Sequence, residues 1–270
     1  MLIFSSLTMD DQEYFYFDGQ LHIPPDRIKE ALEFAIRSEL NAIAFTNYGN
    51  TNPFDCLARN RDDGGLRVIG SSMWDIQQKS GTVLKVSSPE GHIFVLKGEE
   101  VKTRQGHVLA WGIDRAIEGG LDIKDTLEMI YHQGGVAVFS HLLVKLFHGC
   151  GMDVFDKMYQ RFGGYPIGVE KNGQISPLWD IIFGPNRRVL EIAEERGVAC
   201  FGTSDIHGAY GGQVTNIGAR YYTSIPLRHI DPDKMRGSLA EVMISKPEVV
   251  QVDGGSNSFL ETAIWNLQSL

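Results

Sequence analysis

The chain has 270 residues, of which 43% are hydrophobic and 22% charged. This composition excludes a disordered chain, and the 30 glycines follow no triplet that would indicate collagen. The net charge is −9, and an acidic surface repels phosphate backbones. We therefore do not expect nucleic acid as a partner.

The three cysteines form no Cys-x-x-Cys pair, and their odd number argues against a set of disulfides. We therefore expect a reducing, cytoplasmic environment. The first fifteen residues have no basic start, and no apolar run reaches about 18 residues, so neither a signal peptide nor a membrane span is expected.

The first half of the chain mixes apolar runs with one helical pattern. Apolar spacing after Pro24 and Pro25 predicts a helix, and the residues at 49–66 are polar and glycine-rich enough to predict a loop. Apolar or alternating runs predict strands at 2–7, 42–48, 82–88, 92–103 and 106–113.

In the second half, strands and helices alternate. Helices are predicted at 123–132, 152–162, 187–196 and 232–244, and strands at 135–141, 167–173, 198–207 and 217–222. Gly197 is a suitable C-cap for the third of these helices. Such alternation is typical of βαβ units with a parallel sheet. We predict one domain, residues 1–270, in which residues 226–270 form a C-terminal helical extension that includes a short amphipathic helix at 259–267.

Polar side chains stand where several of these strands begin or end. In parallel α/β folds the chemistry lies beyond the carboxyl ends of the strands. Imidazoles and carboxylates together suit Zn, Mn or Fe better than Ca or Mg. The residues in such positions are Glu99, Glu100, His107, His141, Glu170, Asp205 and His207.

Each residue alone also has an ordinary structural explanation. His141 could be a hydrogen-bonded loop residue, Glu99 and Glu100 a solvated pair, and Asp205 a turn residue. The remaining histidines have no partner pattern in the sequence and are assigned structural roles: His22, His92, His132, His148 and His229.

Five segments together resemble one protein family. They are, in chain order, FDGQLHIPPDRIKEALEFAIRSELNAIAFTNYGNT, KGEEVKTRQGHVLAWGI, GGVAVFSH, IGVEKNG and GVACFGTSDIHGAYGG. Over roughly residues 1–225 they are similar to the polymerase and histidinol phosphatase (PHP) superfamily of metal-dependent phosphoesterases. The last segment is the most specific, because it resembles the family's Ser-Asp-x-His motif.

The resemblance implies an α/β fold, a distorted (β/α)7 TIM-like barrel, with up to three metal ions at the carboxyl ends of its strands. It implies that Glu100 is a bridging metal carboxylate and that the other metal ligands are His107, His141, Asp205 and His207. Two family motifs differ in this sequence. The first, His-x-His, has no counterpart after the strand at 2–7, where Ser5, Ser6, Leu7 and Thr8 stand, or else Asp11 and Glu13. The second, Thr-Asp-His, is Thr46-Asn47-Tyr48. We therefore expect one or two divalent ions rather than three.

The resemblance leaves two functional hypotheses. In the first, the protein hydrolyses the ester of a small phosphorylated molecule, with Asp205 or His207 positioning water or protonating the leaving group. Lys102 and Arg104 would then bind the phosphate. In the second, the barrel is catalytically inactive and keeps a metal or ligand for a structural or sensing role. An oligomer is possible, although we expect the C-terminal helix to pack on its own barrel.

Overall fold

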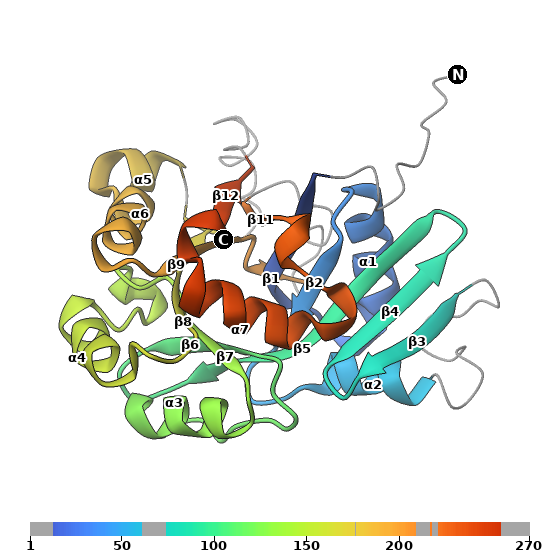
Figure 1. The fold of residues 1–270 in the computed structure, drawn as a ribbon, viewed down its shortest axis with the longest axis horizontal. Helices are drawn as coiled ribbons and strands as arrows, with labels where there is room; N and C mark the ends of the chain where they lie inside the picture. The colour runs from blue at the N-terminus through green and yellow to red at the C-terminus, as the bar shows by residue number, and fades with distance from the viewer. Residues whose placement is uncertain (1–12, 61–73, 176, 209–216, 218–220, 255–270) are drawn as a thin grey trace.

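A computed structural model describes residues 13–60, 74–175, 177–208, 217 and 221–254. One strongly curved sheet organises them, and helices lie around its outside (Figure 1). In spatial order its strands are β12 (Gln251–Asp253), β11 (Tyr222–Pro226), β1 (Tyr14–His22), β2 (Ala42–Phe45), β5 (Gly91–Lys102), β6 (His107–Trp111), β7 (Val136–Phe139), β8 (Ile167–Asn172) and β9 (Ala199–Thr203).

The sheet comes close to closing on itself. The short strand β10 (Ile206–His207) follows β9 in the chain and pairs in parallel with the end of β1. The chain that leaves β9 therefore returns to β1, and the fold is an α/β barrel of the TIM-like type, as the family resemblance implied. A hairpin, β3 (Asp75–Ser80) and β4 (Val83–Ser88), extends the sheet from β5.

The barrel is not wholly parallel, which corrects one expectation. Strand β6 runs antiparallel to both β5 and β7. The reason is the short connection at residues 103–106, where the Thr103 amide donates to the Gly106 carbonyl over 3.0 Å. A turn of this length can join only antiparallel strands, because a parallel crossover needs a dozen or more residues. The carboxyl end of β5 therefore lies beside the start of β6.

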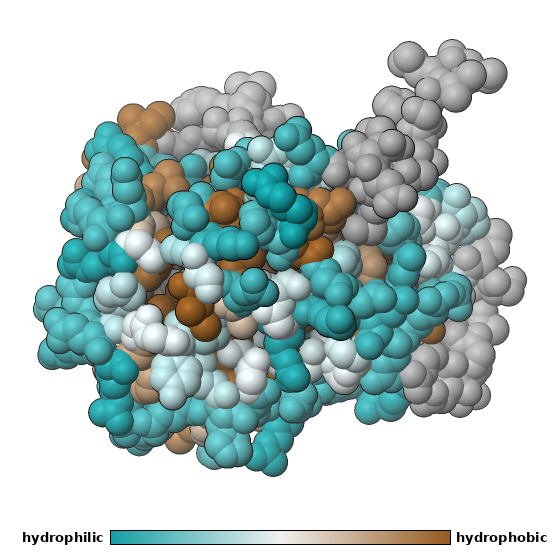
Figure 2. Space-filling model, viewed as in Figure 1, coloured by the Kyte–Doolittle hydropathy of each residue, from teal (hydrophilic) through white to brown (hydrophobic). Residues whose placement is uncertain are grey.

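The helices follow their apolar spacing. Helices α3 (Ile123–His132) and α4 (Met152–Phe162) have the predicted bounds, and α6 (Pro185–Arg196) ends at Gly197, whose φ of 63° is the left-handed C-cap conformation. Helices α1 (Ile28–Arg37), α5 (Pro177–Phe183) and α7 (Met235–Ser245) also belong to this outer layer. On α5 the side chains of Leu178, Ile181, Ile182 and Phe183 are exposed, and they form the apolar patch at the upper left of Figure 2.

The predicted loop at 49–66 is wrong in part, because α2 (Asn52–Asn60) lies inside it. Its composition is polar, but Phe54 and Leu57 are three residues apart and both are buried in the cluster that also contains Leu84 and Val95. One apolar face, supplied by two residues, is enough to fix this short helix against the sheet.

The first described strand, β1, was not predicted, and the predicted strand at 2–7 lies outside the described residues. The sequence of β1 is apolar at first and then reads Asp18-Gly19-Gln20, which interrupts the pattern expected of a buried strand. Asp18 and Gln20 are nonetheless fully buried, because this end of the strand forms part of a polar site inside the barrel.

The segment after residue 226 contributes both a helix and a strand. Leu239, Val242 and Met243 of α7 pack into the same core cluster as Trp111 and Phe201, and β12 pairs with β11. In Figure 1, α7 lies across the barrel. The predicted helix at 259–267 is outside the described residues, and the division into barrel and extension stays a prediction. No helix in the described ranges is long and apolar enough to cross a membrane.

Gly19 should tolerate no side chain, because a Cβ atom there would collide with the Trp111 ring, whose Nε1 donates to the Gly19 carbonyl over 2.8 Å. We expect Gly19→Ala to lower the free energy of unfolding by about 1–3 kcal/mol, as measured by urea denaturation. Gly237→Ala in α7 is the matched control, since no atom lies within 4 Å of the added Cβ. A stable Gly19→Ala protein would contradict this packing.

Candidate metal centre

Three side chains from neighbouring strands meet at one end of the barrel. Lys102 of β5 pairs with His107 of β6, and His141 follows the end of β7, beside the start of β6. The antiparallel position of β6 therefore places its first residue next to two carboxyl-terminal strand ends. His107 Nδ1 and His141 Nε2 each lie 3.1 Å from Oε1 of Glu100. We call these three residues the Glu100 group.

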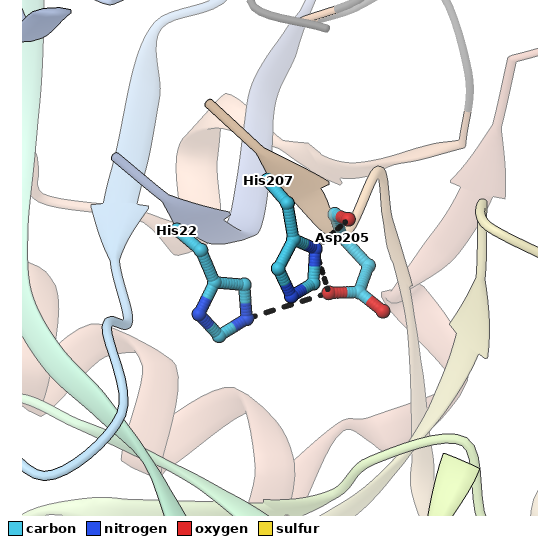
Figure 3. A group of neighbouring side chains, drawn as sticks. All are labelled: His22, Asp205 and His207. Carbon is cyan, nitrogen blue, oxygen red and sulfur yellow. Dashed lines mark hydrogen bonds and ion pairs between the residues drawn. The ribbon is translucent and has the colours of Figure 1, made fainter. Parts of the chain in front are cut away.

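A second set of side chains lies on β1 and β10, where the barrel closes. His22 and His207 are partners in the parallel register, and their rings stack with centroids 4.3 Å apart. Asp205 stands just before β10, and its Oδ1 lies 3.4 Å from His22 Nε2 (Figure 3). We call His22, Asp205 and His207 the Asp205 group.

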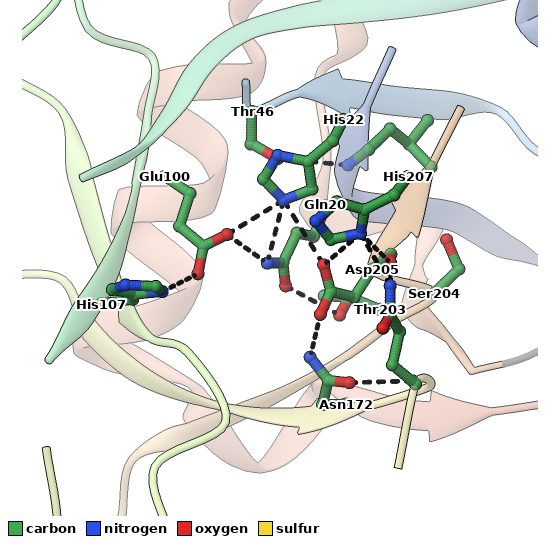
Figure 4. Close-up of polar contacts among 12 residues, drawn as sticks. Gln20, His22, Thr46, Glu100, His107, Asn172, Thr203, Ser204, Asp205 and His207 are labelled. Carbon is green, nitrogen blue, oxygen red and sulfur yellow. Dashed lines mark hydrogen bonds and ion pairs between the residues drawn. The ribbon is translucent and has the colours of Figure 1, made fainter. Parts of the chain in front are cut away.

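Glu100 connects the two groups through its two oxygens. While Oε1 faces His107 and His141, Oε2 lies 2.9 Å from His22 Nε2 (Figure 4). Gln20 Nε2 also donates to Oε2, over 2.8 Å. Glu100 is fully buried, so one carboxylate at the centre of the site faces imidazoles on both sides.

The buried charges shift one another's pKa. Burial alone would raise the pKa of Glu100, but hydrogen bonds from His107, His141 and His22 outweigh it and hold that pKa well below its usual range. Burial opposes charge on His22 too, yet the carboxylates of Asp205 and Glu100 prevail and raise the pKa of His22 to about 9. The site therefore favours positive charge beside Glu100.

The donor atoms of each group fit a divalent metal ion of their own. The candidate ligand atoms of each group all lie within 4.8 Å of one another. Tetrahedral Zn²⁺ with ligands at about 2.1 Å requires ligand atoms roughly 3.4 Å apart, close to the 3.1 Å and 3.4 Å found here. Oδ1 of Asp205 is buried without a hydrogen-bond partner among the described residues, as expected of an oxygen available to a cation. Imidazole and carboxylate donors suit Zn, Mn or Fe.

The structure thus brings together all five predicted ligands and adds His22, which the sequence analysis had assigned a structural role. Only one of the residues considered for the first motif is described by the structure. Ser5, Ser6, Leu7, Thr8 and Asp11 lie outside the described residues, and Glu13 is exposed at the opposite end of β1. At the end of β1, the alternation of Gln20-Leu21-His22 points both polar side chains inward.

Thr46 and Asn47, from the altered second motif, support β1 instead of facing the two groups. Thr46 Oγ1 accepts from the Leu21 amide over 3.1 Å. Asn47 accepts from the Ile23 amide and donates to the Ile23 carbonyl, both over 3.0 Å. They fix the backbone on either side of His22, so they act on the site through that strand.

Tyr48 is the member of this motif that reaches the site. Its ring lies 4.5 Å from that of His22 and 5.6 Å from that of His107, so it spans both groups. The exposed Lys102 places its Nζ 3.7 Å from the centroid of the Tyr48 ring. Arg104 is directed elsewhere, since its Nε donates to the Gly120 carbonyl over 2.9 Å. Of the two predicted phosphate-binding residues, Lys102 is the one in contact with the site.

His148 also has a neighbour that the sequence did not indicate. Its ring stacks on that of His107 with centroids 5.4 Å apart, and its carbonyl accepts from the His107 amide over 3.2 Å. Its φ of 62° is a left-handed conformation that is uncommon for residues other than glycine. His148 thus packs against the His107 ring and also bonds its backbone.

Comparisons with known proteins identify the fold. No family model matches the chain, and no curated protein does. PsfC from Pseudomonas syringae is similar in structure, with a TM-score of 0.64 and 15% identity over 96% of this chain and 100% of PsfC. A proposed metal-dependent phosphoesterase from Bifidobacterium adolescentis has a TM-score of 0.48 and 13% identity over 71% of this chain and 87% of its own. At such identities the likeness to PsfC establishes a shared fold, and function has to be argued from the site.

The charge on His22 predicts how stability depends on pH. Its folded-state pKa of about 9 lies above the ordinary value of about 6.5, so its contribution is complete below about pH 6.5 and is lost as the pH rises through 9. Urea unfolding of the metal-free protein should show a loss of about 1–3 kcal/mol from pH 7 to 9.5. The loss should be smaller in His22→Gln and unchanged in His132→Gln on α3. Equal losses in all three proteins would contradict the charged His22.

Proposed function

We propose that the chain is a metal-dependent phosphoesterase that hydrolyses the ester of a small phosphorylated molecule. The observation that carries the proposal is the buried Glu100 carboxylate between two groups of imidazole and carboxylate donors. Two hydrolytic metal ions that share one carboxylate are a common arrangement for phosphate ester cleavage. With His22 counted, each group has three donors, which favours two ions over one.

Ions bound at the two groups would polarise a phosphoryl oxygen and lower the pKa of a bound water. The chain's own residues divide the remaining tasks. The Asp205 carboxylate, whose Oδ1 is buried and faces His22 at 3.4 Å, is proposed to orient a water molecule. The His207 side chain is 25% exposed, against 6% for His22, so the Asp205 group is open to solvent on the side of His207. His207 is therefore placed to meet the leaving group.

Lys102 is the residue proposed to bind the phosphate. It forms no ion pair with any carboxylate in the described residues, and its ammonium lies over Tyr48, whose ring contacts His22 and His107. A free cation at the edge of a site that would take phosphate can neutralise the non-bridging oxygens of the ester. Arg104 could contribute only if it released the Gly120 carbonyl.

A catalytically inactive barrel that binds a metal or ligand is the second candidate. It is favoured by the altered second motif, because Thr46 and Asn47 support β1 and Tyr48 fills the space beside both groups. The inactive barrel could also hold a metal, so bound metal alone does not separate the two candidates, whereas turnover does.

Metal removal should abolish activity. We expect more than one Zn or Mn ion per chain by elemental analysis, and hydrolysis of an aryl phosphate that stops with chelator and returns with Mn or Zn. His141→Ala removes a donor of the Glu100 group and should lower kcat/KM by more than about 100-fold. His92→Ala, at the start of β5 and away from the site, is the control. Metal binding without turnover would support the inactive barrel, and a protein without bound metal would exclude the phosphoesterase.

Loss of Lys102 should weaken substrate binding more than it slows turnover. Lys102→Met keeps an unbranched, flexible side chain one atom shorter and removes its charge, so KM should rise about 5–10-fold, the value of one partly exposed charged contact. Lys85→Met is the control, because Lys85 also lies over an aromatic ring, that of Phe94, but on β4. A KM unchanged from the wild type would argue against a role for Lys102 in phosphate binding.

A further inference from the structure

We propose that Asn172 is a positioning residue that holds one ligand of each metal group, so that its loss weakens both groups together. This inference rests on the proposed metal centre. Asn172 is the last residue of β8 and is fully buried, and it belongs to neither group of candidate ligands.

Two of the candidate ligands have strained backbones. His141 has a φ of 33° and Asp205 a φ of 52°, both in the left-handed region that residues with a Cβ atom seldom adopt. Such conformations persist only where surrounding contacts fix them. His141 belongs to the Glu100 group and Asp205 to the Asp205 group. Each group therefore depends on a contact that fixes the backbone of one of its ligands.

Glu170 and Asn172 supply those contacts. The His141 amide donates to Oε2 of Glu170 over 2.6 Å. The Asn172 Nδ2 donates to that same oxygen over 3.1 Å and to Asp205 Oδ2 over 2.9 Å. Only a primary amide places two hydrogens on one neutral nitrogen, so Asn172 can join two carboxylates without adding charge. The chain of contacts runs from the His141 backbone through Glu170 and Asn172 to Asp205.

Asn172 is itself fixed by hydrogen bonds to its backbone and to its side chain. Its backbone amide donates to Asn186 Oδ1, and its carbonyl accepts from Asn186 Nδ2, both over 3.0 Å. Its Oδ1 accepts from the Gln174 amide over 2.8 Å. Asn186 lies in the first turn of α6, so this outer helix fixes the backbone of Asn172.

Gln174 provides an internal comparison. Its Nε2 donates to the Asp205 carbonyl and lies 2.7 Å from His207 Nδ1, so of the two groups its side chain bonds the Asp205 group within the described part of the chain. If Asn172 acts as proposed, a change at 172 affects both groups, while a change at 174 affects one. A general loss of packing at this end of β8 would not separate the two residues in this way.

The test measures the affinity of each group for Mn²⁺ by isothermal titration calorimetry. In His107→Gln the Asp205 group is the one that keeps all its ligands. In His207→Gln it is the Glu100 group that keeps all its ligands. We expect Asn172→Ser to weaken Mn²⁺ binding about tenfold or more in both backgrounds, the usual effect of losing a residue that supports a metal ligand. Gln174→Ala should weaken it only in the His107→Gln protein. Asn172→Leu, which keeps the volume, is the second variant should the serine protein not fold.

Asn41→Ser is the matched control, because Asn41 is also buried and bonds the Tyr16 amide at the other end of the barrel. It should leave both affinities within about twofold. A second measurement needs no metal: amide hydrogen exchange at His141 should become faster in Asn172→Ser than in Asn41→Ser. Weakening of only one group, or of neither, with unchanged exchange at His141 overturns the role of Asn172. A wild-type protein that binds no Mn²⁺ overturns the proposed function instead.

Discussion

The site depends on one buried carboxylate that cannot remain buried without cationic neighbours. Glu100 is fully buried, and taking an isolated carboxylate out of water costs more free energy than folding normally provides. Here three imidazoles surround it, two at Oε1 and one at Oε2. The same arrangement that satisfies the charge in the metal-free protein is the one a pair of divalent ions would use, with the ions taking the place of protons.

The topology of the barrel makes this arrangement possible. Had every strand been parallel, His107 would stand at the amino end of its strand, far from Glu100. The short turn at 103–106 reverses β6, so its first residue reaches the carboxyl ends of β5 and β7. At the other side, β10 adds to the end of β1 and brings His207 beside His22. Two small departures from a regular βα barrel therefore assemble the two groups: the β5–β6 hairpin and the two-residue strand β10.

Much of the fold could be predicted from the sequence, because helices such as α3 and α4 have a regular apolar face and a clear beginning and end. The same reasoning missed β1, since polar residues that enter a site interrupt the pattern of a buried strand. His22, on the same strand, was overlooked as well. A lone histidine shows its function only when a distant segment, here β10, lies beside it. The convergence of residues 100, 107 and 141 could be anticipated only from motif order, and the supporting contacts of Asn172 could not be anticipated at all.

Anomalous diffraction from crystals grown with Mn²⁺ or Zn²⁺ would reveal bound ions and their ligands together. We predict two peaks, one on each side of the Glu100 carboxylate, about 2.0–2.3 Å from their ligand atoms. One should lie beside His107 Nδ1 and His141 Nε2, and the other beside His22 Nε2 and Asp205 Oδ1. A map with no peak at this end of the barrel, in which the three imidazoles still bond directly to Glu100, would show that the carboxylate is balanced by protons alone and would contradict the metal centre.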